Sequence, residues 1–455
     1  MAANKIEDLI SLCKRRGFVY PGSEIYGGLK GTYDYGPLGI ELKNNLKEAW
    51  WQSMVYERDD IEGLEGSLIS HRNIWYHSGH EEALTDLLVD CKNCKARLRL
   101  DKLVNGKCDN CGGIEFTEPR EFNLLFPLNV GPVVDNSSKA YLRGETAQIT
   151  YINFKNVLDS TSRKLPFGIV QVGKSFRNEI IARNFLFRTR EFEQMELQFF
   201  ITPGEEEEWF KKWKEIRYNW WIKQGLKTEN LRWHKHDENE LVFYCSAAED
   251  IYYNFPHGFD ELEGIHNRTD YDLGSHTKNQ RDFNITAKVK ENNDSIFKLS
   301  YTDKLTQKTF IPYVIETAAG LGRGLVAILN EAYTDEKLED GSTRLVLKLA
   351  RHLSPIKVAI IPLAKNKPQI VEKAKEIKSL LQKLKIGRVI YEDIGNVGKA
   401  YRRHDEIGTP ICITVDYDTF ENYPNTVTVR DRDTMFQERI HLNKLIDYVK
   451  GYYSI

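Results

Sequence analysis

The chain has 455 residues, 41% of them hydrophobic, and a formal net charge of −2, and this length allows two or three domains with cores of their own. A charge so close to zero excludes strong overall attraction to nucleic acids, so any RNA contact must come from local patches or from shape. No run of about 18 apolar residues predicts a membrane helix, and the N-terminus shows no basic segment followed by an apolar one, so we expect a cytoplasmic protein without membrane attachment.

The start of the chain is predicted to contain two helices with an irregular segment between them. Residues 3 to 17 carry apolar side chains at helical spacing, whereas the stretch 31 to 39, Gly-Thr-Tyr-Asp-Tyr-Gly-Pro-Leu-Gly, has too many turn residues for regular structure. An amphipathic helix over 40 to 56 has an apolar stripe wide enough to pack on a sheet or on a partner chain. A strand is expected over about 62 to 70.

Four of the seven cysteines form two Cys-x-x-Cys pairs separated by thirteen residues. This spacing is typical of tetrahedral zinc sites rather than of disulfides. The predicted zinc ligands are Cys91, Cys94, Cys108 and Cys111, in an insertion over about 88 to 118 that contains a short strand over 97 to 104 and resembles a zinc ribbon. Four unliganded thiols are the alternative. The remaining cysteines are expected to act as small buried apolar side chains: Cys13, Cys245 and Cys412.

A helix over about 146 to 158, with Thr146 as its N-cap, and a buried strand from Leu165 are predicted next. Charged and aromatic residues then recur at even spacing through 176 to 196. Two strands joined by a loop at 183 to 185 would place five side chains on one face: Arg177, Glu179, Arg188, Phe192 and Glu196. Such a face can hold a nucleotide, because guanidinium groups bind phosphates, rings stack on bases and carboxylates bind amines. A solvated hairpin with cross-strand ion pairs is the alternative.

Residues 203 to 310 are rich in aromatic and charged side chains. The acidic run Glu205 to Glu208 is expected to be a solvated helix face, and the five tryptophans from Trp209 to Trp233 are expected in the core. The alternation over 284 to 310 predicts an antiparallel hairpin.

A strand over 311 to 315 is predicted to precede Glu316-Thr-Ala-Ala-Gly-Leu-Gly-Arg323 and an apolar helix over 324 to 333. The glycines at 320, 322 and 324 allow close backbone approach to a ligand, and the start of the helix is favourable for phosphate.

Composition shifts near Ser354-Pro355, and strands then alternate with helices, which predicts an α/β domain over 355 to 455. Its predicted elements are a strand over 358–363, a helix over 368–384, a strand over 389–392, a helix over 397–405, a strand over 411–415, hairpin strands over 426–440 and a final helix. An RNA-binding face is one interpretation of its basic residues, and scattered surface charge is the other: Lys399, Arg402, Arg403, Arg430 and Arg432.

Several segments together resemble one known family. Phe176-Arg-x-Glu, a loop, and Arg188-x-x-x-Phe-x-x-x-Glu resemble motif 2 of the class II aminoacyl-tRNA synthetases, and the wording over 188 to 196 resembles the glycyl-tRNA synthetases of the dimeric type. Tyr-Asp-Tyr-Gly-Pro-Leu-Gly over 33 to 39 and Leu-Arg-Gly-Glu-Thr-Ala-Gln over 142 to 148 are similar to segments of that family. Residues 316 to 323 resemble motif 3, and 40 to 70 resemble motif 1.

The resemblance implies an α/β fold with an α+β catalytic domain on an antiparallel sheet over 1–350, carrying the zinc module and the aromatic-rich insertion, and an anticodon-binding domain over 355–455. The implied activity is activation of glycine with ATP and transfer of the glycyl group to tRNA-Gly. Implied cofactors are Mg²⁺ and structural Zn²⁺, and the implied assembly is a homodimer joined through the motif 1 region. The alternative is a non-catalytic synthetase-like RNA-binding protein, and a synthetase for another amino acid is a lesser one.

The resemblance also implies roles for single residues. For ATP these are Arg177, Asn178, Glu179, Phe187, Arg188, Thr189, Arg190, Glu191, Phe192, Glu261, Leu262, Gly320, Leu321, Gly322 and Arg323. Of these, Arg177 would hold the α-phosphate, and Arg188 and Arg323 would hold the γ-phosphate; Arg177 and Arg323 are the implied catalytic residues. Phe192 would stack on adenine, and Glu261 would help to bind Mg²⁺. For glycine they are Arg97, Glu145, Phe192, Glu193, Gln194, Met195, Glu196, Glu316, Thr317, Ala318, Ala319 and Gly320.

Glu145, Glu196 and Glu316 would surround the glycine ammonium. The sequence departs from the family wording at Ala318, where a serine is usual, and in the motif 2 loop at Ile181, Ala182 and Phe185.

Overall fold

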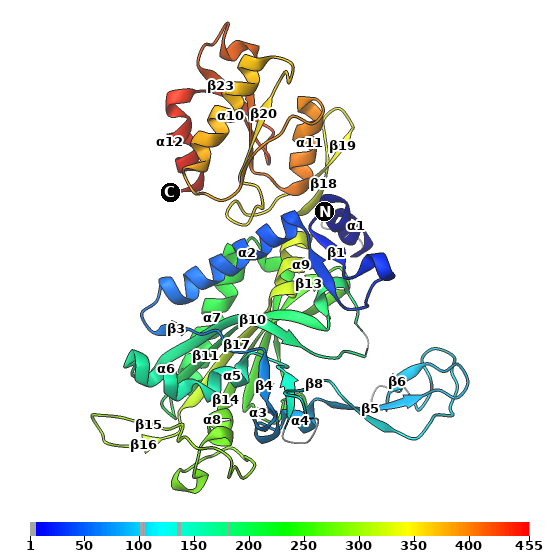
Figure 1. Cartoon of the computed structure of the whole chain (residues 1–455), viewed down its shortest axis with the longest axis vertical. Coiled ribbons are helices and arrows are strands. Elements are labelled where there is room, and N and C mark those ends of the chain that lie inside the picture. Colours follow the sequence, from blue (N-terminus) through cyan, green and yellow to red (C-terminus); the bar gives the residue numbers. More distant parts are fainter. Residues whose placement is uncertain (1–5, 101–102, 104, 134–137, 181, 455) are drawn as a thin grey trace.

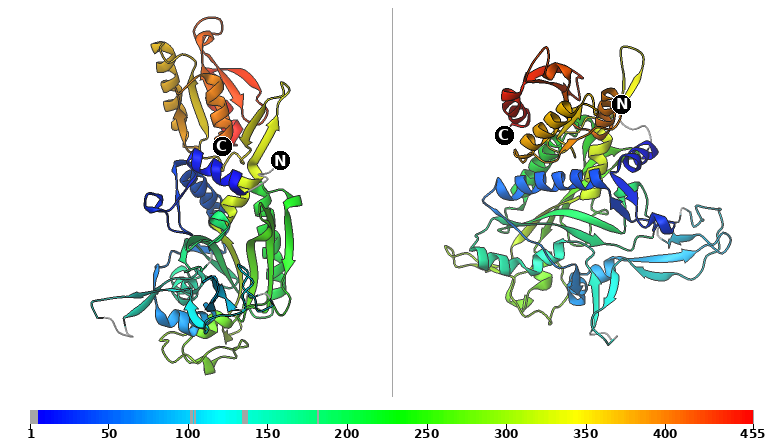
Figure 2. Two further views of the ribbon diagram at one scale, coloured as in Figure 1. Left: turned by 90° about the vertical axis from the view of Figure 1, so that its right-hand side faces the viewer. Right: turned by 45° about the horizontal axis from the view of Figure 1, so that its top comes forward.

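The computed structural model describes residues 6–100, 103, 105–133, 138–180 and 182–454. A large N-terminal unit surrounds a twisted sheet, a narrow arm leaves its side, and a smaller C-terminal unit lies above it (Figures 1 and 2). The predicted α/β fold class is confirmed, because the large sheet is almost entirely antiparallel and the C-terminal unit is mixed α/β. Among the described helices, none has the length and apolar character that crossing a bilayer requires.

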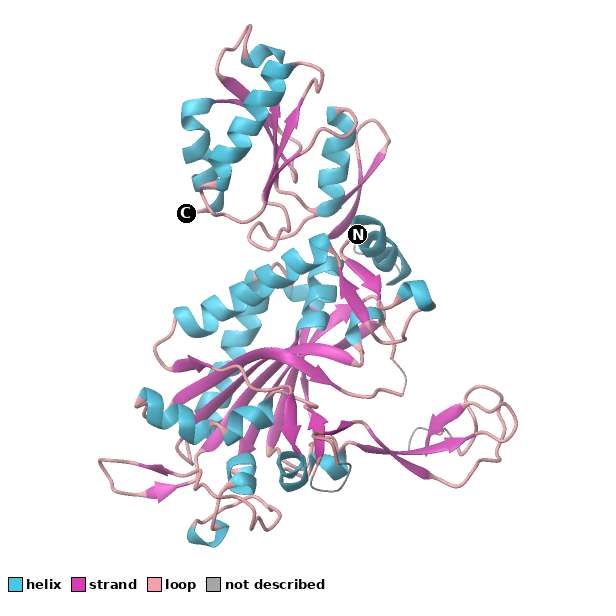
Figure 3. Ribbon diagram, in the orientation of Figure 1, coloured by secondary structure: helices cyan, strands magenta, loops and turns pink. Residues whose placement is uncertain are grey.

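The central sheet has seven strands in the order β12-β13-β14-β17-β11-β10-β3, and its fan is visible in Figure 3. All neighbours are antiparallel except β10 and β3. The strands are β3 (Ile61–Gly63), β10 (Phe167–Phe176), β11 (Glu191–Ile201), β12 (Leu231–Lys235), β13 (Ala247–Phe255), β14 (Gly258–Thr269) and β17 (Tyr313–Gly320).

The two faces of this sheet are covered by different helices. One face packs on α1 (Ile6–Arg16), α2 (Pro37–Trp51), α7 (Glu206–Lys223) and α9 (Leu321–Ala332), and the other on α5 (Ala147–Ile152), α6 (Phe154–Thr161) and α8 (Tyr271–His276). Side chains alternate between these faces with period two. Odd-numbered Leu197 and Ile315 therefore lie in the first core, whereas even-numbered Phe200 and Val314 lie in the second.

The shorter elements surround this framework. Near the N-terminus are β1 (Val19–Pro21), η1 (Glu24–Tyr26), β2 (Tyr33–Tyr35), the π-helix η2 (Gln52–Tyr56), β4 (Ile69–His71), α3 (Arg72–His77) and α4 (His80–Ala83). The arm holds β5 (Thr85–Asp90), β6 (Arg97–Arg99) and β7 (Arg120–Asn123), and the chain returns through β8 (Phe126–Asn129) and β9 (Lys139–Leu142). Later come η4 (Phe185–Phe187), η5 (Thr228–Asn230), η6 (Gln280–Asp282), β15 (Tyr301–Thr302) and β16 (Thr309–Phe310).

The C-terminal unit has a five-stranded sheet in the order β21-β20-β22-β23-β24. Its elements are β20 (Val358–Pro362), α10 (Pro368–Gln382), β21 (Val389–Tyr391), α11 (Val397–Ile407), β22 (Ile411–Val415), η7 (Tyr417–Thr419), β23 (Thr426–Asp431), β24 (Gln437–His441) and α12 (Leu442–Tyr453). This order confirms the predicted alternation of strands and helices. A hairpin not predicted from the sequence, β18 (Tyr333–Lys337) and β19 (Thr343–Leu347), precedes the boundary expected between 350 and 355.

Several local predictions were wrong. The segment 31–39 is partly regular, because β2 pairs with β1 and Pro37 opens α2. The strand expected over 62–70 is split into β3 and β4, the helix expected over 146–158 is split at Asn153, and 284–310 forms loops rather than a hairpin except for the short pair β15 and β16. Val104, the end of the strand expected in the arm, lies outside the described residues.

Tryptophan positions were predicted correctly. Trp213, Trp220 and Trp221 are buried, and Trp209 and Trp233 are half-buried against the same core. The acidic run before them is mostly exposed. Of the isolated cysteines, Cys13 and Cys412 are buried and Cys245 is half-buried.

Three of the five basic residues considered for an RNA-binding face have structural partners. Arg403 donates to the carbonyl oxygen of Ile394 at 3.0 Å and pairs with Glu392, and the other two are buried arginines. The guanidinium of Arg430 donates to both carboxylate oxygens of buried Asp405, at 2.8 and 3.0 Å. Arg432 donates to the carbonyl oxygens of Gly408 and Leu349, both at 2.8 Å. The side chains of Arg430 and Arg432 are only 4% and 2% exposed. They attach α11 and the segment around Leu349 to the sheet, so they do not belong to the candidate RNA surface. Lys399 and Arg402 remain exposed.

Candidate active site

A cavity of about 320 Å³ opens on the face of the central sheet that α5 and α8 cover only in part. Its floor comes from even-numbered residues of β11 and β17, because period-two alternation turns these away from the main core. Phe192, Gln194 and Glu196 belong to β11, and Glu316 and Ala318 to β17. The floor was therefore predictable from strand periodicity.

Three carboxylates lie deep in this cavity. Glu145, Glu196 and Glu316 are 6%, 4% and 3% exposed, and they come from the segment just before α5, from β11 and from β17. Burying three acids together is unfavourable unless each has a partner or keeps its proton.

Glu196 is the carboxyl that keeps its proton. Burial raises the pKa of Glu196 to about 8, and the charges of Glu316 and Glu145 act in the same direction. The hydroxyl of Thr146 and the amide of Gln194 donate to its two oxygens. Thr146 was predicted as a helix N-cap, but it makes no side-chain capping bond, because its hydroxyl is used by Glu196.

Glu316 is ionised because a buried arginine faces it. Arg268, 1% exposed, donates to Glu316 at 3.0 Å and to both oxygens of Asp272 at 2.7 and 2.8 Å, while its guanidinium lies 3.9 Å from the ring centre of Tyr244. Burial alone would raise the pKa of Glu316, but the charge of Arg268 and the contact with His266 lower it to about 2.

Glu145 is also ionised. Burial opposes its charge, but the neighbouring side chains of His80, Arg268 and Arg177 hold the pKa of Glu145 well below its usual range. Nε2 of His80 lies 3.2 Å from one oxygen, and a guanidinium nitrogen of Arg177 lies 3.7 Å from the other.

The β10–β11 connection brings cations over this floor. Arg177 lies 5.5 Å above the ring centre of Phe192, and its Nε donates to the carbonyl oxygen of Gly144 at 3.0 Å. This contact uses one edge of the guanidinium, and the side chain is 30% exposed toward the cavity. An arginine held in this way can bind an anionic ligand.

Two further arginines are paired with carboxylates at the mouth. Arg188 contacts Glu179 at 2.7 Å, and Arg323, in the first turn of α9, contacts Glu261 at 2.9 Å. Arg323 also lies 4.4 Å from the ring centre of Phe187. A polyanion could exchange these pairs for its own contacts, and the N-terminus of α9 adds a favourable dipole.

Many of the residues predicted for ATP and glycine line this cavity. They are Glu145, Arg177, Glu179, Phe187, Arg188, Thr189, Phe192, Glu193, Gln194, Glu196, Glu261, Glu316, Ala318, Ala319, Gly320, Gly322 and Arg323. The prediction that strand alternation would place Arg177, Glu179 and Arg188 on one face was wrong. Because β10 ends at Phe176, these three side chains reach the cavity from the β10–β11 connection.

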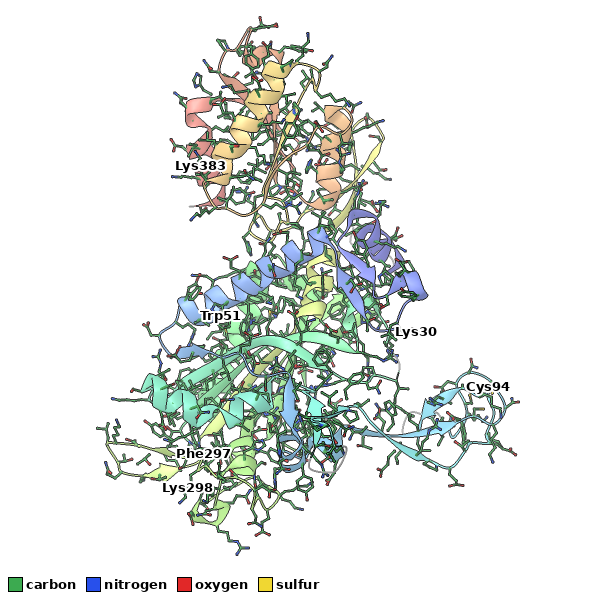
Figure 4. The ribbon with its side chains drawn as sticks, viewed as in Figure 1. Lys30, Trp51, Cys94, Phe297, Lys298 and Lys383 are labelled. Carbon is green, nitrogen blue, oxygen red and sulfur yellow. The ribbon has the colours of Figure 1, made fainter. Side chains whose placement is uncertain are left out.

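Other predicted residues lie outside the cavity lining. Met195, Leu262 and Thr317 on the strands, and Leu321 at the start of α9, are fully buried. Asn178 donates its backbone N–H to Leu124, Arg190 donates to the carbonyl of Lys30, and Glu191 pairs with surface Lys174. Lys30, which belongs to the N-terminal part of the chain, is labelled in Figure 4.

Arg97, which was predicted to contact glycine, lies in the arm and not in the cavity lining. It belongs to β6, where its Nε donates to Asp90 at 3.0 Å. In the part of the chain that the structure describes, it does not contact Glu145, Glu196 or Glu316. Ile181 lies outside the described residues, whereas Ala182 and Phe185 pack against the N-terminal segment at Gly31 and Tyr33.

Sequence reasoning missed several lining residues, namely His236, Asp250, Tyr244, His266 and Arg268. His266 and Arg268 alternate on β14, a signal that could have been read as one polar strand face. His236 contacts Asp250 at 2.8 Å, and burial together with the charge of Glu261 raises the pKa of Asp250. No sequence pattern marked this pair, because β12 and β13 come together only in the fold.

The four paired cysteines form a second candidate site at the end of the arm, where Cys94 is labelled in Figure 4. Sγ of Cys91 lies 3.7 Å from Sγ of Cys111, and Sγ of Cys94 lies 3.6 Å from Sγ of Cys108. With a Zn–S distance of about 2.3 Å, tetrahedral geometry requires sulfur–sulfur distances of about 3.8 Å. The four thiols therefore fit a zinc ion.

Comparison with known proteins gives matches along nearly the whole chain. A family model described as "tRNA synthetase class II core domain (G, H, P, S and T)" matches residues 133–332, and one described as "Anticodon binding domain" matches residues 357–452. A glycine–tRNA ligase of Thermus thermophilus is 51% identical over an alignment of 501 positions, with 99% of each chain covered. Glycine–tRNA ligases of Deinococcus radiodurans and Borrelia hermsii are each 50% identical, covering 99% and 98% of this chain and 99% and 97% of their own.

Proposed function

The chain belongs to the glycine–tRNA ligases, a family of class II aminoacyl-tRNA synthetases, and we propose that its cavity activates glycine with ATP and then transfers the glycyl group to tRNA-Gly. This assignment rests on one observation: three buried carboxylates and several partly exposed arginines line the same cavity. The carboxylates suit an ammonium group, and the arginines suit phosphates. The intact cavity gives no support to the alternative of a non-catalytic RNA-binding protein.

In the first step a carboxylate oxygen of glycine attacks the α-phosphorus of ATP, a new P–O bond forms, and the bond to pyrophosphate breaks. The protein needs no nucleophile of its own for this step, so its task is positioning and neutralisation of charge. We assign the α-phosphate to Arg177, the γ-phosphate to Arg188 and Arg323, and the adenine ring to Phe192. In the second step a hydroxyl of the terminal ribose of tRNA attacks the glycyl carbonyl, and AMP leaves.

We also propose that Glu261 helps to bind the Mg²⁺ ion that accompanies ATP. Glu261 and the more deeply buried Asp250 both line the cavity, and the charge of Glu261 contributes to the raised pKa of Asp250. Two interacting carboxyl groups of this kind could hold a divalent cation. When bound, Mg²⁺ would neutralise phosphate charge. Arg323 would then leave Glu261 for the γ-phosphate.

The test of the proposed function is isotope exchange between pyrophosphate and ATP. We expect exchange only when glycine is present, because glycine alone offers an amino group to the carboxylates without a side chain to collide with Ala318. Exchange supported equally by alanine or serine, or none at all with folded protein, would remove the proposal.

Glycine binding is expected to release a proton. At pH 7 the empty cavity holds Glu196 protonated, since its pKa is about 8. An ammonium ion beside it favours the carboxylate, so binding expels that proton, and glycine affinity should rise toward pH 8 by up to about tenfold per pH unit. Calorimetric titration of glycine at pH 7 in two buffers of different ionisation enthalpy measures the release, which Glu196→Gln should abolish. Equal heats in both buffers would contradict this assignment.

We propose that the arm holds structural zinc. The expected result is about one zinc per chain by mass spectrometry of the purified protein. Cys94→Ser should lower this content and expose the arm to trypsin, while leaving glycine-dependent exchange measurable, because the arm has little core of its own. Cys245→Ser, a cysteine outside the arm, is the matched control. An arm that resists trypsin in metal-free protein would contradict zinc as its staple.

We further propose a homodimer formed through α2 and β3, in keeping with the predicted motif 1 region, acting in the cytoplasm. An open groove beside these elements has apolar and charged lining, including Trp51, Tyr56 and Leu64. Tyr56 is 71% exposed in the single chain, so a second chain could bury it.

A further inference from the structure

His80 is buried beside the glycine cavity although no role has been given to it. It opens α4 and is only 3% exposed. Its ring stacks on Tyr244 at 5.6 Å between centres and meets the edges of Trp75 and Phe243 at 6.0 and 5.9 Å. An aromatic side chain could fill this space, so packing does not require a histidine.

The ring nitrogens explain the choice of histidine. Nδ1 lies 2.9 Å from the hydroxyl oxygen of Ser78, which fixes the plane of the ring. Nε2 lies 3.2 Å from a carboxylate oxygen of Glu145 and has no aligned hydrogen-bond partner among the described residues. Because an ionised carboxylate only accepts, Nε2 must carry a hydrogen to make this contact favourable.

Glu145 depends on that contact more than on any other. Burial alone would raise the pKa of Glu145, and His80 precedes Arg268 and Arg177 among the groups that lower it. The amide of Gln148 reaches the same carboxylate at 3.3 Å. The ionised carboxylate of Glu316 lies in the same cavity and repels that of Glu145.

We propose that His80 is a positioning residue for glycine, which holds the Glu145 carboxylate ionised and oriented toward the amino group of the substrate. The inference rests on the proposed role of Glu145 as a ligand of the glycine ammonium. His80 itself does not line the cavity, so it acts through Glu145.

The test is a kinetic comparison of His80→Phe with His80→Gln in the full-length protein. Phenylalanine fills the aromatic site without a donor, and we expect the KM for glycine in pyrophosphate exchange to rise about tenfold or more. The KM for ATP and kcat should stay within about threefold, since neither Arg177 nor Arg323 contacts the ring. Glutamine restores an N–H near the position of Nε2 and should return the glycine KM most of the way to the wild-type value.

The matched control is His77→Phe, because His77 is equally buried and pairs with Asp294 away from the cavity. Its glycine KM should not change. The inference is overturned if His80→Phe leaves the glycine KM unchanged, or if it raises both KM values and glutamine fails to restore them. If His80→Phe does not fold, Ser78→Ala, which frees the ring, must still raise the glycine KM. Absence of exchange in the wild type would instead reject the proposed function.

Discussion

Replacing Arg177 with glutamine is expected to lower kcat/KM for ATP in glycine-dependent pyrophosphate exchange by about a hundredfold to a thousandfold. Negative charge grows on the α-phosphate oxygens as the glycine carboxylate attacks, and a fixed guanidinium stabilises that charge in a partly water-excluded cavity. Phe192 and the carbonyl of Gly144 already hold the side chain in place. Little reorganisation is therefore needed when ATP binds.

Lys174→Gln is the control for this change. It removes the same charge three residues earlier, but Lys174 is 46% exposed and pairs with surface Glu191. Exposed pairs contribute little, so we expect activity within about twofold of the wild type. If the two variants lose activity equally, overall charge and not the α-phosphate contact determines the loss. If Arg177→Gln is fully active, the assignment of Arg177 is wrong.

Regular periodicity is what made the fold predictable. The C-terminal unit alternates short β-branched strands with amphipathic helices, and every predicted element was found. Strand alternation likewise placed Phe192 and Glu196 on one face. Over 284–310 a weak alternation of single residues predicted a hairpin. The segment forms mostly loops instead, and polar contacts hold it in place, such as those that Asp270 accepts from Thr286.

The site was predictable in composition but not in geometry. Resemblance named most lining residues, yet it could not show that Arg177 and Arg188 reach the cavity from a connection, because strand ends depend on pairing and not on side-chain type. It also could not find His80, whose contact with Glu145 joins distant segments. For the basic residues, the sequence suggested a functional role where the role is structural. Arg430 and Arg432 were considered for an RNA-binding face, but each donates to a buried group that only the folded structure brings close.

The carboxylates explain how the cavity can bind an amino acid that has no side chain. Two of them are ionised by neighbouring cations, and the third is kept neutral by burial, so the empty cavity avoids three adjacent negative charges. Binding of the ammonium lets Glu196 ionise. Affinity for the amino group is thus high, but every amino acid has such a group, so selectivity must come from exclusion of larger side chains.

Ala318 is the residue best placed for that exclusion. It lies on β17 between Glu196 on β11 and Gly264 on β14, and its methyl group faces the cavity. Directly paired residues share a face, so the methyl group of Ala318 lies beside the Glu196 carboxyl on one side, and Gly264 adds no side chain on the other. A larger side chain at 318 would occupy the space beside the α-carbon of glycine.

We therefore expect Ala318→Val to lower kcat/KM for glycine by about a hundredfold while leaving the KM for ATP unchanged, because overpacking a rigid site costs about 1–3 kcal/mol. Ala318→Ser adds only a hydroxyl, the group usual in the family, and should stay within about tenfold of the wild type. Pyrophosphate exchange measured with glycine and with alanine distinguishes these outcomes. Full activity of the valine variant with glycine would mean that the substrate lies elsewhere in the cavity. Equal losses in both variants would point to disturbance of Glu316, two residues away on the same strand face, rather than to a steric limit.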